Sequence, residues 1–384
     1  MKAVLRKNGL LTLLIILITA CSGGDSGSAA TFNLTVTTDG PGAGTVTSAP
    51  AGINCGTDCS ESYAENTVVS LTASPAAGSS FAGWSGACSG TDSCSVTMDV
   101  ETSVTATFVE FSVDCSSYAV YSPTHVPVMT PSTTGTSTTT MIVMPGKAGS
   151  PLDPYLSPLY TGLATAGYDV IAPYLPWSGL DWDGPMCEAM NYLDELAAQE
   201  AVKGNAVIIA GHSMGGAHAL IYGVTSPAVE VKGIIALAPG HFPHLELPLL
   251  TVFDPSTAAS ITSSITKAED MVANSNGDQL DTFDTLFPDL NNPLLQISAT
   301  ANDYLSYHAL YQYPDINDVL PTIKLPVIWL AGADDPLTDF YDMPALFSRI
   351  TSQKSKYEVV SGDHLDMVSN SAARIVVWIS SLGL

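Results

Sequence analysis

The sequence predicts an α/β fold with a parallel sheet, preceded by a small all-β domain. Three observations lead to this prediction. Residues 32–110 contain short runs in which apolar and polar residues alternate, separated by turn residues, as is typical of β-strands. Over residues 111–384, apolar strand-like runs alternate with helical stretches in the βαβ order of a parallel sheet. The 384-residue chain is long enough for both domains, and the second can bury a full sheet.

Residues 1–20 are typical of an export signal. Basic residues precede an apolar run from Leu10 to Ile18, which is too short to span a bilayer. The run ends in Ile18-Thr19-Ala20-Cys21, which resembles the lipobox of bacterial lipoproteins. The resemblance implies cleavage before Cys21, a lipid on its thiol and a membrane anchor, with residues 21–31 as a Gly/Ser tether. An ordinary secreted protein with an incidental cysteine is the alternative.

Two further features agree with export. In the lipoprotein family, Ser22 after the cysteine implies sorting to the outer membrane or cell surface if the host is Gram-negative. Once Cys21 is set aside, six of the seven cysteines remain, an even number typical of disulfide bonding. They are Cys55, Cys59, Cys88, Cys94, Cys115 and Cys187. Among the first four, pairing of sequence neighbours is the simplest arrangement and a zinc site is the alternative, while the last two would form a bridge in the α/β domain.

The residues from 32 to 110 are expected to form one β-domain. Its strand candidates are Leu34–Thr38, Gly44–Thr47, Thr67–Ala73, Phe81–Trp84 and Ser103–Phe108. The segment resembles a single divergent bacterial repeat of the internalin-associated, β-grasp-like kind. The resemblance implies a spacer or adhesion module, and therefore a partner at a surface. Trp84 would be either a ligand platform or a core aromatic, and the core interpretation is favoured.

The α/β domain is expected over residues 111–384. Its expected strands are Thr139–Met144, Tyr168–Pro173, Ala206–Ala210, Val231–Ala238, Leu325–Gly332 and Lys356–Val360. Its expected helices are Pro154–Ala166, Pro185–Gln199, Ala217–Val224 and Ala372–Leu382. Near its start, Tyr118–Tyr121 is expected as a further strand and Pro131–Thr138 as a polar loop.

A nucleophile elbow is predicted where Gly211-His212-Ser213-Met214-Gly215-Gly216 joins an apolar strand to a helical stretch. In such a turn the nucleophile, here Ser213, has a strained backbone, and the flanking glycines are needed because side chains there would collide with neighbouring backbone. A serine hydroxyl is a weak nucleophile at neutral pH and needs a base and an orienting carboxylate. Both follow in the expected order at strand ends: Asp334 or Asp335 first, then His364.

The oxyanion of an acyl-transfer reaction needs two backbone N–H groups. One would come from Met214, the residue after the nucleophile. The other would come from Lys147, in the loop Pro145–Gly149 after the strand Thr139–Met144. A role for the Lys147 side chain stays open.

With these residues in place, the chain resembles the α/β-hydrolase superfamily from Phe111 to Leu384. Pro145-Gly146 before the oxyanion residue is similar to the dienelactone-hydrolase and cutinase-like esterase branches. The resemblance implies an α/β-hydrolase fold and a Ser-His-Asp acyl-enzyme mechanism. It favours Asp335 over Asp334, because the family's acid usually stands three residues after the strand-end glycine.

The stretch from Gly240 to Lys324 is expected to form a cap. It is far longer than an ordinary connection in a compact domain, and cutinase-like polyesterases usually lack such a lid. Two weak metal signals occur in it, the pair His241 and His244 and the segment Asn274–Asp278, which lacks the spacing of a calcium loop. We expect no metal and no organic cofactor.

The net charge of the chain limits the classes of substrate that are expected. The chain has 12 Lys and Arg against 37 Asp and Glu. Such a negative field repels nucleic acid and polyanions, so a neutral ester is favoured and no nucleic-acid partner is expected. The sequence therefore predicts a lipid-anchored, exported serine hydrolase of carboxylic esters, of the esterase or lipase kind. The alternatives are a surface adhesion protein with an inactive hydrolase domain and a peptidase of the same fold.

Overall fold

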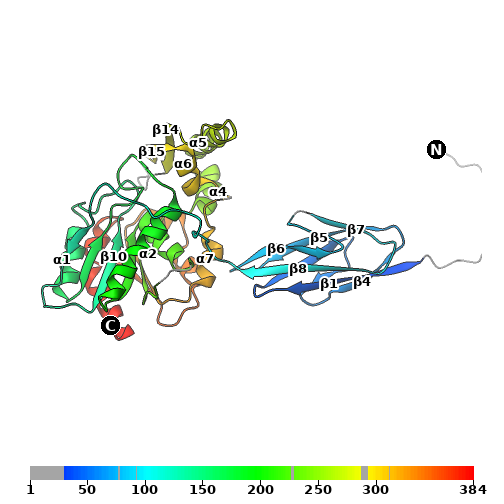
Figure 1. The fold of residues 1–384 in the computed structure, drawn as a ribbon, viewed down its shortest axis with the longest axis horizontal. Helices are drawn as coiled ribbons and strands as arrows, with labels where there is room; N and C mark the ends of the chain where they lie inside the picture. Colours follow the sequence, from blue (N-terminus) through cyan, green and yellow to red (C-terminus); the bar gives the residue numbers. More distant parts are fainter. Residues whose placement is uncertain (1–29, 77, 92, 226–228, 287–292, 311) are drawn as a thin grey trace, which may run out of the picture.

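The computed structural model describes residues 30–384, except residues 77, 92, 226–228, 287–292 and 311. Two domains lie end to end, joined where the last strand of the β-domain leads into the larger domain (Figure 1). The predicted signal peptide and Cys21 lie outside the described residues. Within the described part of the chain, no helix is both long and apolar enough to cross a membrane.

The β-domain consists of two four-stranded sheets, in the orders β4-β1-β8-β6 and β3-β2-β5-β7. The strands are β1 (Thr31–Asp39), β2 (Gly44–Ala49), β3 (Asn54–Cys55), β4 (Ser60–Ala64), β5 (Val68–Pro75), β6 (Ser79–Gly86), β7 (Cys94–Thr97) and β8 (Thr102–Glu110). Strands β1 and β8 run parallel in the centre of the first sheet, with Val36 opposite Val104. Every other pair in the two sheets is antiparallel.

One hydrophobic core fills the space between these two sheets. Alternate residues of each strand point into it, for example Leu34 and Val36 from β1 and Val69 and Leu71 from β5. Trp84 is a core residue with its ring edge against Phe81, at 4.9 Å between centroids. Disulfides join neighbouring cysteines in the sequence, Cys55 to Cys59 and Cys88 to Cys94. In a domain this small, such cross-links supplement a limited core.

The larger domain is built on a seven-stranded sheet in the order β17-β16-β13-β12-β10-β11-β9. All neighbours are parallel except the edge strand β9, which runs antiparallel to β11. The strands are β9 (Val128–Thr130), β10 (Thr139–Met144), β11 (Asp169–Ala172), β12 (Ala206–His212), β13 (Ile234–Leu237), β16 (Val327–Gly332) and β17 (Lys356–Val360). This arrangement confirms the predicted α/β fold.

Helices cover both faces of this sheet, which is why its central strands β10 and β12 are buried along almost their whole length and are mostly apolar. Along β10, Ile142 and Met144 contribute to one core, whereas Met141 and Val143 contribute to the other. The first core is covered by α2 (Met186–Val202) and α3 (Met214–Tyr222). The second is covered by α1 (Ser157–Thr165), α10 (Asp366–Ser369) and α11 (Ala372–Leu382). Two short helices, α8 (Leu337–Phe340) and α9 (Met343–Phe347), follow β16.

The segment between β13 and β16 contains the stretch that was expected to form a cap, and we call it the cap. Its elements are α4 (Pro243–Phe253), α5 (Pro255–Ala273), β14 (Leu280–Leu286), β15 (Leu294–Thr300), α6 (Ala301–His308) and α7 (Ile316–Thr322). Strands β14 and β15 pair antiparallel, and with α5 and α6 they gather at one end of the domain (Figure 1). Backbone hydrogen bonds tie β15 to the core, from Trp182 N–H to Ser298 O and from Ser298 N–H to Leu180 O.

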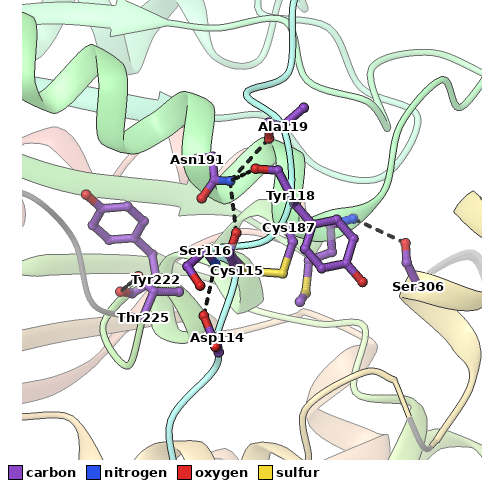
Figure 2. The surroundings of a disulfide bond; sticks show 11 residues. Asp114, Cys115, Ser116, Tyr118, Ala119, Cys187, Asn191, Tyr222, Thr225 and Ser306 are labelled. Carbon is purple, nitrogen blue, oxygen red and sulfur yellow. Dashed lines mark hydrogen bonds between the residues drawn. A yellow bond between two sulfur atoms is a disulfide. The ribbon is translucent and has the colours of Figure 1, made fainter.

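The prediction of a strand over Tyr118–Tyr121 is wrong. These residues are irregular, and a side-chain amide rather than a neighbouring strand bonds the carbonyls of Tyr118 and Ala119. Asn191 Nδ2 donates to the carbonyls of Cys115, Tyr118 and Ala119 (Figure 2). The disulfide from Cys115 to Cys187 fixes the same segment to α2. The segment that connects the two domains is therefore cross-linked to the larger domain near the start of that domain.

Candidate active site

The turn between β12 and α3 holds Ser213 in a strained backbone conformation, with φ 54° and ψ −120°. The glycines around it are needed for steric reasons. A Cβ on Gly211 would lie 2.1 Å from the carbonyl oxygen of Gly215, and one on Gly215 would lie 2.4 Å from that of Pro145. The Ser213 N–H donates to Leu237 O at 2.9 Å, which ties the turn to the neighbouring strand β13. The sequence motif thus folds as a tight strand-to-helix turn with serine at its apex.

The loops after β16 and β17 bring Asp335 and His364 together. The Nδ1 atom of His364 lies 2.9 Å from Asp335 Oδ2. Asp335 is 2% exposed, and its Oδ1 accepts a hydrogen bond from the Leu337 N–H at 2.9 Å. Because a carboxylate only accepts, Nδ1 of His364 carries the proton and Nε2 presents its lone pair. Asp334 is exposed, and its N–H donates to Gly362 O, so the structure pairs Asp335 with His364.

Ser213 and His364 line the same cavity, which has a volume of about 290 Å³. Its walls are Gly146, Lys147, Ala148, Gly149, Asp153, Tyr155, His212, Ser213, Leu295, His364 and Leu365. One wall residue, Leu295, comes from β15 of the cap. His364 Nε2 is buried and has no hydrogen-bond partner among the described residues. The site therefore presents an unengaged base nitrogen and a serine hydroxyl in one cavity.

The predicted oxyanion donors belong to Lys147, in a loop that lines this cavity, and to Met214, which follows the cavity residue Ser213. Met214 is the first residue of α3, where a backbone N–H has no acceptor within the helix. The Lys147 N–H donates to no acceptor within the part of the chain that the structure describes. The loop that carries it is braced at both sides, since Ala148 N–H donates to Trp177 O at 3.1 Å and Gly149 N–H to Gly146 O at 3.0 Å. Neither N–H group thus has an acceptor among the described residues.

Sequence reasoning missed the role of His212, which lies within the elbow motif. Its Nε2 lies 2.8 Å from the backbone carbonyl of His364, and its Nδ1 lies 3.3 Å from the Tyr155 hydroxyl. The carbonyl only accepts, so Nε2 donates and Nδ1 accepts. Burial, and secondly the nearby His364, lower the pKa of His212 well below its usual range, so the ring is neutral. His212 therefore holds the loop that carries His364.

The Lys147 side chain also has a defined position, which the sequence left open. It is buried, and its Nζ donates to Thr285 Oγ1 at 2.9 Å and to Leu286 O at 2.7 Å. Both acceptors belong to β14 of the cap. Burial lowers the pKa of Lys147 to about 8, although Glu246 opposes this shift. A residue of the oxyanion loop is thus bonded directly to the cap.

The cap histidines bind backbone carbonyls. His241 Nε2 lies 2.9 Å from Tyr307 O, and His244 Nε2 lies 2.8 Å from Tyr313 O. Within the described residues, no group of three or more His, Cys, Asp or Glu side chains is arranged to hold a metal ion.

An α/β sheet with a strained serine at the strand-to-helix turn and a buried Asp-His pair defines the hydrolase class of this fold. The model of the alpha/beta hydrolase family matches residues 142–376, more than half of the chain. The protein belongs to this family. The model of the divergent InlB B-repeat domain matches residues 32–112, which confirms the predicted repeat domain. No curated protein matches the chain.

Several solved structures resemble the hydrolase domain. A monoacylglycerol lipase of Paleococcus ferrophilus is 17% identical, with 67% of this chain and 98% of that chain covered and a TM-score of 0.48. A soluble variant of the monoglyceride lipase from Saccharomyces cerevisiae is 17% identical, with 70% and 98% covered and a TM-score of 0.45. Est1E from Butyrivibrio proteoclasticus is 14% identical, with 66% and 92% covered and a TM-score of 0.43.

Proposed function

We propose that the protein is a serine hydrolase that cleaves carboxylic esters through a covalent acyl-enzyme. The observation that carries this proposal is the Asp335–His364 hydrogen bond of 2.9 Å, beside a cavity that His364 shares with the strained Ser213. A serine becomes a useful nucleophile only when a positioned base takes its proton. The arrangement supplies that base, and Asp335 fixes its orientation.

In the proposed mechanism, Ser213 Oγ attacks the ester carbonyl while its proton moves to His364 Nε2. Asp335 holds Nδ1–H and stabilises the imidazolium that forms. The carbonyl oxygen becomes an oxyanion, which accepts hydrogen bonds from the Lys147 and Met214 N–H groups. The C–O bond to the leaving alcohol then breaks as His364 returns the proton to that oxygen. Water deacylates the enzyme by the same steps, with His364 as the base.

The substrate class follows from charge and from the cavity wall. The chain carries 25 more acidic than basic residues, so an anionic polymer would be repelled. The cavity wall includes the apolar side chains of Leu295, Ala148 and Leu365. A neutral ester with an apolar acyl group fits these surroundings.

We also propose that the enzyme is exported and anchored through a lipid on Cys21. The three disulfides support export, because such bonds form in oxidising compartments. They engage every cysteine of the chain except Cys21. In a bacterial host, Cys21→Ser should move the protein from the membrane fraction to the soluble fraction. Unchanged membrane association would contradict the anchor.

The enzymatic proposal is tested with p-nitrophenyl esters from acetate to palmitate. The disulfide-bonded wild type should hydrolyse members of this series. Ser213→Ala should lower kcat by several orders of magnitude, as removal of a triad serine does, and keep the same melting temperature. Equal turnover by both proteins would place the nucleophile elsewhere. Absence of turnover by a folded wild type would favour a peptidase or a binding protein.

A further inference from the structure

The cap contacts the catalytic core through buried polar groups, a contact we call the cap seam. On the core side it contains Lys147 from the oxyanion loop and His218 from α3. On the cap side it contains His241, Thr285, His308 and Tyr313. All six are buried. The rings of His241 and Tyr313 lie 5.3 Å apart and those of His218 and Tyr313 lie 5.8 Å apart, so the groups form one cluster.

A directed chain of hydrogen bonds crosses this seam. His308 Nδ1 lies 3.0 Å from Tyr304 O, and because a carbonyl only accepts, Nδ1 carries the proton. Burial, with Lys147 as a lesser cause, lowers the pKa of His308 to about 3, so the ring is neutral and its Nε2 accepts. Thr285 Oγ1, 2.7 Å from that Nε2, therefore donates to it and accepts from Lys147 Nζ. The chain fixes the Lys147 amine to both β14 and α6.

The same residue carries the backbone N–H assigned to the oxyanion, so an anchor on its side chain also bears on the position of that amide. We propose that Lys147 is a positioning residue, whose side chain ties β14 of the cap to the oxyanion loop and so helps to place its own N–H for catalysis. This inference rests on the proposed serine hydrolase function. It gives the cap a part in transition-state stabilisation in addition to enclosing the substrate.

The other polar groups of the cap seam are less well satisfied by hydrogen bonds than Lys147 is. His218 Nε2, His241 Nδ1 and Tyr313 Oη are buried and have no hydrogen-bond partner among the described residues. Unpaired buried polar groups destabilise the closed arrangement, and water would satisfy them if the cap lifted. The Lys147 bonds to Thr285 and Leu286 are therefore the satisfied polar bonds of the seam. The backbone bonds between β15 and the core and the shared apolar packing also join the cap to the core.

Four variants test the proposal. Lys147→Met keeps the length of the side chain and removes its donors, and Thr285→Val keeps the shape and removes the hydroxyl. The third variant combines them. Lys267→Met is the matched control, because Lys267 Nζ also donates to a β14 carbonyl, that of Thr282 at 3.0 Å, but from α5 within the cap. For each variant we would measure kcat and KM for a p-nitrophenyl ester, the melting temperature and amide hydrogen exchange.

Loss of one oxyanion donor typically lowers kcat about 10²–10³-fold, and misplacement of a donor should cost less. We expect Lys147→Met to lower kcat by about tenfold or more with KM within about twofold, and Thr285→Val to lower it less. The double variant should be no slower than Lys147→Met, since both remove one connection. Lys267→Met should keep wild-type kcat. Wild-type kcat in Lys147→Met, or losses that multiply in the double variant, would overturn the proposal.

Amide hydrogen exchange tests the connection between the oxyanion loop and β14 without any measurement of enzyme activity. It therefore remains decisive if the protein proves not to hydrolyse esters. Lys147→Met should speed exchange both in residues 145–149 and in residues 280–286. Lys267→Met should affect only residues 280–286. If Lys147→Met leaves exchange in the oxyanion loop unchanged, the connection between cap and loop is contradicted, whatever the activity of the wild type.

Discussion

The catalytic pair and the cap seam are both buried and polar, but their hydrogen bonds are satisfied differently. Asp335 uses both carboxylate oxygens and His364 uses Nδ1, which leaves Nε2 as the unpaired atom of the pair. In the seam, three buried atoms have no hydrogen-bond partner among the described residues. The comparison shows that a buried polar atom without a hydrogen bond can have two different consequences. At the catalytic pair it leaves a base for the proposed chemistry, and in the seam it weakens a contact that opening would hydrate.

The largest expected effect falls on the catalytic pair. Asp335→Asn should lower kcat by about 10⁴-fold, because an amide in this place favours the wrong tautomer of His364. Asp334→Asn is the matched control and should retain activity, since Asp334 is exposed and does not contact His364. Steady-state kinetics on one ester would distinguish them. A larger loss in Asp334→Asn would assign the acid to the other carboxylate.

A smaller loss is expected when the support of His364 is removed. His212→Leu deletes the donor to His364 O and leaves that carbonyl unpaired, so kcat should fall by about 10- to 100-fold as the base loses its position. Tyr155→Phe removes only the 3.3 Å bond to His212 and should cost less. If His212→Leu retains wild-type kcat, its bond to the His364 loop has no part in positioning.

The free energy of unfolding should depend on pH in a way that reflects the buried titratable groups of the cap seam. Lys147 has a pKa of about 8, below its usual 10.5, so between these values the unfolded chain binds more protons and stability rises with pH. His218 has a pKa of about 4 and His308 of about 3, so stability should fall as pH drops below 6.5 towards these values.

The alkaline rise should be no more than about 3 kcal/mol in the free energy of unfolding. Urea midpoints at pH 5, 7, 8 and 9 would measure the fall below pH 6.5 (the acid limb) and the rise above pH 8 (the alkaline limb). Burial raises the pKa of tyrosines such as Tyr304, Tyr307 and Tyr313, which lowers stability only as the pH approaches 10 and above. Lys147→Met should flatten the alkaline limb, because it removes the buried amine. An unchanged alkaline limb in that variant would show that Lys147 is not the group responsible.

Much of the fold could be predicted because local patterns determine it. The strand Thr139–Met144 and the helix Ala372–Leu382 have the bounds that their patterns predict. Runs buried on both faces of a parallel sheet are continuously apolar, so their ends are easily recognised. The prediction of a strand over Tyr118–Tyr121 was wrong. The side chain of Asn191, which is distant in the sequence, donates hydrogen bonds to the carbonyls of Tyr118 and Ala119.

In the active site, too, some features are determined by neighbouring residues in the sequence and others by residues far apart in it. The elbow is a local motif with a steric cause, and its glycines can be recognised in the sequence. The partners of His212 and Lys147 lie 152 and 138 residues away, so no spacing rule could have identified them. Sequence patterns therefore indicate the reacting groups, whereas the side chains that position them become visible only in the folded chain.

The measurement that tests the central claim most directly is covalent labelling by a fluorophosphonate, followed by mass spectrometry of the peptides. The probe reacts with a serine only when a base activates it. We predict one labelled residue, Ser213, in the folded wild type and greatly reduced labelling in Asp335→Asn. Absence of label from the folded, disulfide-bonded protein, or label on another serine, would contradict the account.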